Sequence, residues 1–332
     1  MRKEGVKPIN AKHYAGDLAQ MQSLPLGAKI RMTQNRVRQW YDHFNGEVYV
    51  SFSGGKDSTV LLDIVRGLYP DIPAVYCDTG LEYPEIREFV KNVENVIWLY
   101  PIRYDRHKKK YVRTNFKEVI QTYGYPVASK ETAKRIYELR HHNLTPEYRA
   151  KLMGKTDDNP LKAVPKRWRF LVDAPFEVSS KCCDAMKKRP FHHYESETGQ
   201  KPIVATMAIE SKLREDSWMR YGCNAFDKTT GPQSRPMSFW TEQDVLKYLT
   251  TYQIPYCPVY GEIVQTESGL KTTGCERTGC MFCMFGCHHD QTPNRFQRMQ
   301  KTHPKQYAHC MKPTSEGGLG LDEVLTFIGV DH

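Results

Sequence analysis

Residues 47–58 read EVYVSFSGGKDS, and this stretch decides the fold class. The alternating apolar residues before the glycines predict a buried strand, and DSTVLLDIVRGLY (57–69) has the spacing of an amphipathic helix. Two adjacent glycines let the backbone turn tightly and approach a ligand closely. Because the next helix directs free N–H groups and its positive dipole end at the turn, we expect an anion there, most simply a phosphate chain.

Further strands and helices alternate along the chain. PAVYCDT (73–79), VIWLY (96–100) and KPIVATMAI (201–209) predict strands, whereas LGAKIRMTQNRVRQWYDHF (26–44) and TEQDVLKYLTTY (241–252) predict helices, the latter with a threonine N-cap. This alternation indicates an α/β fold with a parallel twisted sheet flanked by helices.

The same pattern divides the chain into three parts. We expect an N-terminal arm and helix over 1–45, a nucleotide-binding domain over 46–255 and a cysteine-rich segment over 256–332. Residues 104–180 are polar, basic and helical in patches, so we expect them to form a lid.

Composition limits the class of protein. With 39% hydrophobic and 11% aromatic residues among 332, the chain can bury a real core, which argues against disorder. It has no run near the roughly 18 apolar residues that a membrane helix needs, and no apolar leader, so we expect a cytoplasmic protein.

The net charge of +10 favours a polyanionic partner. The basic runs RYDRHKKKYVR (103–113) and KRWR (166–169) are interpreted either as solvated surface or as contacts to nucleic acid or nucleotide. In the second case we expect Trp168 to stack on a base.

The glycine loop fits neither common phosphate-binding pattern. A Walker A loop would need a glycine at Val50 and a serine or threonine at Asp57, and the G-x-G-x-x-G pattern is missing. The stretch resembles the pyrophosphate loop, SGGxDS, of the ATP pyrophosphatase (PP-loop) superfamily, whose members cleave ATP between its α and β phosphates. The resemblance implies ATP and Mg²⁺, with pyrophosphate held by Ser53, Gly54, Gly55, Lys56, Asp57 and Ser58.

Other segments resemble one family of that superfamily. YCDTGLEYPEIREF (76–89), GYPVASKETAKR (124–135) and AIESKLRED (208–216) are similar to segments of phosphoadenosine phosphosulfate (PAPS) reductases, in family order. The chain is identified as a member of the PAPS reductase family, which implies an adenine nucleotide alpha hydrolase-like, Rossmann-like fold. It also implies that Asp78 and Thr79 line the adenosine side and that Glu210, Ser211 and Arg214 form a nucleotide-binding turn.

Four of the ten cysteines resemble a cluster site. An adjacent pair followed by a distant C-x-x-C is similar to the site of adenylylsulfate (APS) reductases. By that resemblance a four-iron, four-sulfur cluster is ligated by Cys182, Cys183, Cys280 and Cys283. A structural zinc held by Cys275, Cys280, Cys283 and Cys287 remains an alternative, as do buried unligated thiols. Cys275 and Cys287 exceed the four ligands, so each is a candidate sulfur carrier, redox thiol or replacement ligand.

The resemblance implies an activity, and one departure refines it. Sulfonucleotide reductases usually lack the complete SGGxDS pattern, whereas here it is intact, which favours ATP as the bound nucleotide; another departure is Met207, where the family usually has arginine. We expect an ATP-dependent sulfur-transfer enzyme that forms AMP and pyrophosphate, with catalytic residues Lys56, Asp57, Cys275 and Cys287. The acceptor would be tRNA, DNA or a small molecule, and a cysteine desulfurase or small thiol would supply sulfur or reducing power. The alternatives are a reductase of APS or PAPS that releases sulfite with AMP or PAP, and a non-catalytic nucleic-acid-binding regulator.

Overall fold

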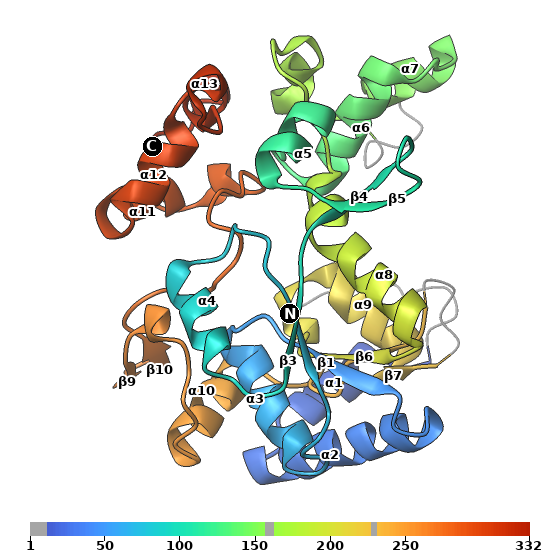
Figure 1. Ribbon diagram of the computed structural model, residues 1–332, viewed down its shortest axis with the longest axis vertical. Helices are drawn as coiled ribbons and strands as arrows, with labels where there is room; N and C mark the ends of the chain where they lie inside the picture. The colour runs from blue at the N-terminus through green and yellow to red at the C-terminus, as the bar shows by residue number, and fades with distance from the viewer. Residues whose placement is uncertain (1–11, 157–162, 227–230) are drawn as a thin grey trace. The chain divides into compact units, whose positions relative to one another are not determined.

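The computed structural model describes residues 12–156, 163–226 and 231–332 (Figure 1). The chain forms two compact units. Unit 1 consists of the chain up to Asp78 together with Tyr83–Leu99 and His192–Thr278, and unit 2 of Thr79–Glu82, Tyr100–Phe191 and Gly279–His332. Contacts within the chain therefore group the predicted lid with the C-terminal residues, whereas the domain boundaries expected from the sequence stay predictions.

A six-stranded sheet forms the centre of unit 1. Its strand order is β3-β2-β1-β6-β8-β7, and every neighbouring pair is parallel except β7 with β8. The strands are β1 (Val48–Ser51), β2 (Ala74–Cys77), β3 (Val96–Leu99), β6 (Lys201–Val204), β7 (Asn224–Ala225) and β8 (Gln233–Ser234). The predicted α/β class with a mostly parallel sheet is confirmed.

Helices follow and precede these strands within unit 1. They are α1 (Ala15–Gln22), α2 (Leu26–His43), α3 (Lys56–Arg66), α4 (Pro84–Lys91), α9 (Lys212–Tyr221) and α10 (Glu242–Thr251), with short 3-10 turns at Ala208–Glu210 and Pro258–Tyr260. A hairpin of β9 (Ile263–Thr266) and β10 (Gly269–Thr272) lies outside the main sheet, and α8 (Arg189–Thr198) continues from unit 2 into unit 1. The N-cap predicted for α10 is confirmed, because the Thr241 side chain accepts a hydrogen bond from the Asp244 N–H.

The core of unit 1 explains why the strand before the glycine loop is buried. Every residue of β2 is buried, and so are the first three of β1. The apolar face of α3 packs on them with Val60, Leu61, Ile64 and Val65, all buried. Burial of each such side chain contributes roughly 1.5–3 kcal/mol to the stability of the fold. This packing holds α3, and with it the loop at its N-terminus, against the sheet.

Unit 2 is mainly helical, with one ribbon of two strands. Its elements are β4 (Ile102–Asp105), β5 (Lys110–Arg113), α5 (Phe116–Tyr123), α6 (Lys130–His141), α7 (Pro146–Leu152), a 3-10 segment (Lys166–Asp173), a π-helical turn (Asp184–Lys188), 3-10 turns (Cys287–His289, Thr314–Glu316), α11 (Arg295–Thr302), α12 (Pro304–Met311) and α13 (Leu321–Phe327). The predicted lid segment thus begins with a β-hairpin, which the sequence did not predict, because charged residues hide the alternation there.

No helix in the described ranges is both long and apolar enough to cross a membrane. The first eleven residues of the predicted N-terminal arm lie outside the described part of the chain.

Candidate functional site

The glycine loop joins the end of β1 to the start of α3. Gly54 has φ +71°, and a Cβ atom there would lie 2.8 Å from Val90 Cγ2 and 2.9 Å from Ile86 Cγ2, so only glycine fits. The Ser53 N–H donates to Ser58 Oγ at 3.2 Å, and Ser58 Oγ donates to the Gly55 carbonyl at 2.9 Å. The two predicted serines therefore fold the loop around the N-terminus of α3.

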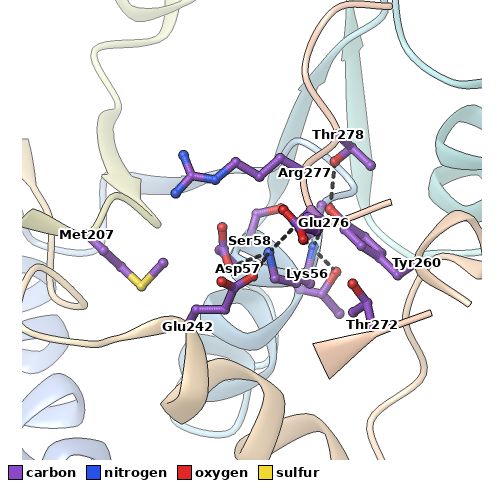
Figure 2. A network of polar contacts seen from close by, with 12 residues as sticks. Lys56, Asp57, Ser58, Met207, Glu242, Tyr260, Thr272, Glu276, Arg277 and Thr278 are labelled. Carbon is purple, nitrogen blue, oxygen red and sulfur yellow. Dashed lines mark hydrogen bonds and ion pairs between the residues drawn. The ribbon is translucent and has the colours of Figure 1, made fainter. Parts of the chain in front are cut away.

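Lys56 is the central cation of this loop (Figure 2). Its buried ammonium group donates to the Glu276 carbonyl oxygen at 3.0 Å and lies 3.2 Å from Glu242 Oε1. Its backbone N–H donates to the Tyr260 hydroxyl oxygen at 3.2 Å. Lys56 is thus fixed by groups that a phosphate oxygen can replace.

Asp57 is an unusual carboxylate, because its atom Oδ1 is buried and has no hydrogen-bond partner among the described residues. Burial raises the pKa of Asp57, the Lys56 charge opposes that rise, and the Glu242 charge adds to it. Lys56 Nζ is 3.8 Å away, beyond hydrogen-bond distance. A carboxylate oxygen buried without a donor is a ligand that Mg²⁺ accepts, so the residues present fit this cation.

The Glu-Ser turn predicted at 208–216 lies in unit 1. Ser211 caps α9 by accepting from the Arg214 N–H, and the Glu210 carboxylate accepts from the Met207 N–H at 2.9 Å and pairs with Arg214. Burial lowers the pKa of Arg214, and the neighbouring Arg277 charge lowers it further. The turn therefore holds one carboxylate between two guanidinium groups.

Arg277 is a site residue that the sequence did not predict. Its Nη1 lies 3.7 Å from Glu210 Oε1, and its charge lowers the pKa of Asp57. Figure 2 shows its side chain extending from the segment of Glu276 and Thr278 toward Met207. The signal in the sequence was an arginine in CERTGC (275–280), beside Glu276, whose carbonyl binds Lys56.

Tyr260 is a second unpredicted residue of this site. Its hydroxyl group forms a hydrogen bond of 2.6 Å with Thr278 Oγ1, in addition to accepting from the Lys56 N–H. A Cβ atom on Gly55 would lie 3.1 Å from this hydroxyl oxygen, so the absence of a side chain at Gly55 lets Tyr260 approach the loop.

Asp78 and Thr79 follow β2 at the boundary between the two units. In unit 1, Asp78 Oδ2 lies 2.8 Å from Arg87 Nη2, and the Asp78 N–H donates to the Leu99 carbonyl. In unit 2, Thr79 Oγ1 donates to Glu82 Oε1 at 2.7 Å. Both side chains have protein partners, and their contact with adenosine stays a prediction.

The four predicted cluster cysteines all belong to unit 2 and influence one another electrostatically. Burial raises the pKa of Cys182, and charges on Cys183, Cys280 and Cys283 raise it further. Burial also raises the pKa of Cys280 to about 11, although the Lys187 charge lowers it. In the described ranges, however, no group of three or more histidine, cysteine, aspartate or glutamate side chains is arranged to hold a metal ion.

Lys187 supplies a positive charge beside these thiols. Burial lowers the pKa of Lys187, but charges on Cys280 and Glu82 outweigh this and raise it, and Lys187 Nζ lies 3.6 Å from Glu82 Oε1. Neighbouring buried thiols resist ionisation unless a cation compensates them, and a coordinated metal supplies that charge.

The two remaining candidate cysteines lie in different units. Cys275 belongs to unit 1, where its N–H donates to the Val259 carbonyl at 3.0 Å. Cys287 belongs to unit 2, is buried, and has its pKa raised to about 11 by that burial. A protonated, buried thiol is a poor nucleophile, so Cys287 is not activated as the structure stands. The catalytic roles of Cys275 and Cys287 stay predictions.

Comparison with known proteins decides the family. Residues 47–289 match the phosphoadenosine phosphosulfate reductase domain. The chain belongs to this family. The PAPS reductase domain thus includes both the glycine loop and the four predicted cluster cysteines.

Relatives of this PAPS reductase family member differ in length. An uncharacterised protein of Methanocaldococcus jannaschii is 36% identical over 248 residues, which are 74% of this chain and 38% of that protein. An adenosine 5'-phosphosulfate reductase of Lysinibacillus sphaericus is 23% identical over 72% of this chain and 77% of its own length. The chain therefore spans less than half of the first relative and about three quarters of the second.

Among solved structures, a PAPS reductase of Candida auris in complex with phosphate is similar with a TM-score of 0.39 and 12% identity. The similarity covers 76% of this chain and 92% of that one.

Proposed function

We propose that this protein is an ATP-dependent sulfur-transfer enzyme that forms AMP and pyrophosphate. The observation that carries the proposal is the complete loop at Ser53–Ser58, in which a buried lysine and a carboxylate oxygen without a hydrogen bond lie together at a helix N-terminus. This set of groups suits a triphosphate with its cation better than a sulfate ester.

In the first step an oxygen of the acceptor attacks the α phosphorus of ATP. The bond from the α phosphorus to the oxygen bridging to the β phosphorus breaks, and pyrophosphate leaves with its charge balanced by Lys56. Asp57 would hold Mg²⁺, which would offset more of this charge. The charges of Arg214 and Arg277 lower the pKa of Asp57 and so favour its ionised form. The product is an adenylylated acceptor.

In the second step the sulfur of a hydrosulfide-equivalent donor attacks the activated carbon. The carbon–sulfur bond forms, the carbon–oxygen bond breaks, and AMP leaves with the oxygen. A cysteine desulfurase is the proposed source of sulfur, and Cys275 and Cys287 are the candidate residues that would carry it as a persulfide. A small thiol would then act as reductant: it forms a disulfide with the carrier cysteine and releases the outer sulfur as hydrosulfide.

Cys182, Cys183, Cys280 and Cys283 would hold a four-iron, four-sulfur cluster. When bound, the cluster would supply a site for sulfur or electrons. The electrostatic coupling of the four thiols within unit 2 supports this ligand set.

A sulfonucleotide reductase is the second candidate function. The similarity to an adenosine 5'-phosphosulfate reductase over 77% of that enzyme's length favours it. Such an enzyme would bind an already adenylylated sulfate and release sulfite with AMP or PAP, without forming pyrophosphate from ATP.

The products separate the two functions. Anaerobically purified protein is incubated with Mg²⁺, candidate acceptors and a sulfide source, either with ATP or with adenylyl sulfate. We expect AMP and pyrophosphate from ATP, and a loss of at least about a hundredfold in rate for Lys56→Ala, because it removes a preorganised charge at the leaving group. Release of sulfite from adenylyl sulfate without pyrophosphate from ATP would establish the reductase instead.

A further inference from the structure

Strands β4 and β5 form a two-stranded ribbon within unit 2 (Figure 1). Their antiparallel register sets Tyr104 opposite Tyr111 and Ile102 opposite Arg113. Because side chains of a strand alternate between its faces, these four residues share one face of the ribbon.

The tyrosine pair on this face is exposed. Tyr104 is 51% and Tyr111 43% exposed, and their ring centroids lie 5.4 Å apart with planes at 74°. The guanidinium group of Arg113 lies 3.6 Å from the centre of the Tyr100 ring. Paired aromatic rings that remain in water contribute little to a core, and flat exposed rings beside arginine are a surface on which other planar groups can stack.

The turn that joins the strands concentrates positive charge. Residues 103–113 contain six lysines and arginines but a single acid, Asp105. Asp105 Oδ1 accepts hydrogen bonds from the backbone N–H groups of His107 and Lys108, at 3.0 and 3.1 Å, and so closes the turn. The charged side chains at the tip are exposed and form no ion pair within the described ranges; they are Arg106, Lys108, Lys109 and Lys110.

A second basic run, expected to contribute a stacking ring, does not do so. Trp168 is only 5% exposed, and its ring packs edge-on to His288 at 4.7 Å. The hypothesis that Trp168 stacks on a base is therefore wrong, because the side chain belongs to the core of unit 2. The two tyrosines of the β4–β5 ribbon are the exposed rings beside a basic run.

We infer that the β4–β5 ribbon binds an unpaired stretch of RNA. Phosphates would pair with Lys108–Lys110, and bases would stack on Tyr104 and Tyr111, which requires base faces that a duplex hides. RNA presents such faces in its loops, whereas DNA is mostly paired. An acidic peptide would satisfy the lysines but would leave the ring pair without a planar partner. The inference deepens the proposed function and rests on it, since it assigns RNA as the acceptor class.

The inference is tested by titrating a short labelled RNA without secondary structure with the protein. Fluorescence anisotropy measures binding over a range of salt concentrations and without ATP. Changing Lys108, Lys109 and Lys110 together to alanine should weaken binding and reduce the slope of log K against log salt by about 2. Changing Tyr104 and Tyr111 together to alanine should weaken binding roughly tenfold or more and leave the slope unchanged.

Matched variants control for charge and for exposed aromatic area. Lys301, Lys305 and Lys312 changed together to alanine remove the same charge from exposed positions on and after α11 and α12, and Tyr148→Ala removes an exposed tyrosine of α7. Both controls should bind RNA like the wild type. Equal binding by the ribbon variants and the wild type would overturn the inference, as would tighter binding of duplex RNA or of single-stranded DNA of the same sequence.

Measuring ATP binding with the same preparations distinguishes a failure of this inference from a failure of the proposed function. If ATP binds and RNA does not, the ribbon inference fails while the nucleotide chemistry stands. If RNA binds through the ribbon and ATP does not bind, the proposed function fails and the ribbon remains an RNA-binding surface.

Discussion

Arg277 lies far from the glycine loop in the sequence, yet its charge acts on Asp57 and its guanidinium group lies beside Glu210. Met207, which also lies at this site, carries no charge. Arg277 is therefore expected to contribute the positive charge that binds the phosphates on the Glu210 side of the loop.

Removing this charge should weaken ATP binding. We expect Arg277→Ala to raise KM for ATP about tenfold, the effect of losing one charge-assisted hydrogen bond, and Arg277→Lys to restore part of it. Steady-state kinetics with varied ATP measure this. Arg220→Ala changes an exposed arginine at the end of α9 and serves as the control. An unchanged KM in Arg277→Ala would exclude Arg277 from the phosphate site.

Asp57 allows a test by cation and by pH. Asp57→Asn keeps the shape but removes the charge, so the Mg²⁺ concentration for half-maximal activity should rise and the maximal rate should fall about tenfold or more. Since burial raises the pKa of Asp57, the ionised form that binds Mg²⁺ is lost as pH falls through this raised value. Activity should therefore decline at a higher pH than an ordinary aspartate would give, and excess Mg²⁺ should shift that decline to lower pH. A Mg²⁺ dependence identical in both proteins would contradict this role.

The residues of the loop could be predicted from the sequence, because their chemistry and their order are both local. Arg277 and Tyr260 could not, because each reaches the loop from a distant part of the chain through contacts that only the fold creates. The prediction that Trp168 stacks on a base was wrong for a related reason. Its basic neighbours indicate an exposed segment, but its own ring is buried.

At the scale of elements, the close packing of the loop against α4 can be tested with two glycines of equal φ. Gly54 and Gly80 both have φ +71°, but only at Gly54 would a Cβ atom meet other atoms, the methyl groups of Val90 and Ile86. Gly80→Ala should cost about 1–2 kcal/mol through backbone strain, and Gly54→Ala a further 1–3 kcal/mol, roughly, through overpacking. Chemical denaturation measures both. Equal losses would show that α4 does not press on the loop.

The elements around the loop could be predicted because their apolar residues repeat with a clear period. Strands β1, β2 and β3 and helices α2, α3 and α10 were all expected near their observed bounds. The β4–β5 ribbon was not, since six of its eight residues are charged or aromatic. Its two aliphatic residues, Ile102 and Val112, lie on opposite faces, so no apolar face exists to reveal the period. Strands β7 and β8 are too short for any pattern.

For the whole molecule, the cluster proposal joins two segments of unit 2 that are distant in sequence. We expect anaerobically purified protein to contain about four iron and four sulfide ions per chain, the content of one such cluster. Cys280→Ser should lose the iron because it removes a ligand, whereas Cys77→Ser should retain it, since Cys77 lies in β2 of unit 1. Metal analysis and visible absorbance measure both. Stoichiometric zinc in place of iron would contradict the cluster proposal.

The proposed function depends on binding of the triphosphate of ATP by the loop at Ser53–Ser58. Calorimetric titration of the wild type and of Lys56→Ala with ATP and Mg²⁺, and in parallel with adenylyl sulfate, tests it without any acceptor or sulfur donor. We expect one ATP per chain and tighter binding of ATP than of adenylyl sulfate. Lys56→Ala should lose at least about tenfold in affinity, because a charged partner of the phosphates is removed. Lys91→Ala, at an exposed lysine of α4, should bind ATP like the wild type. Tight binding of adenylyl sulfate with no measurable binding of ATP would contradict the account.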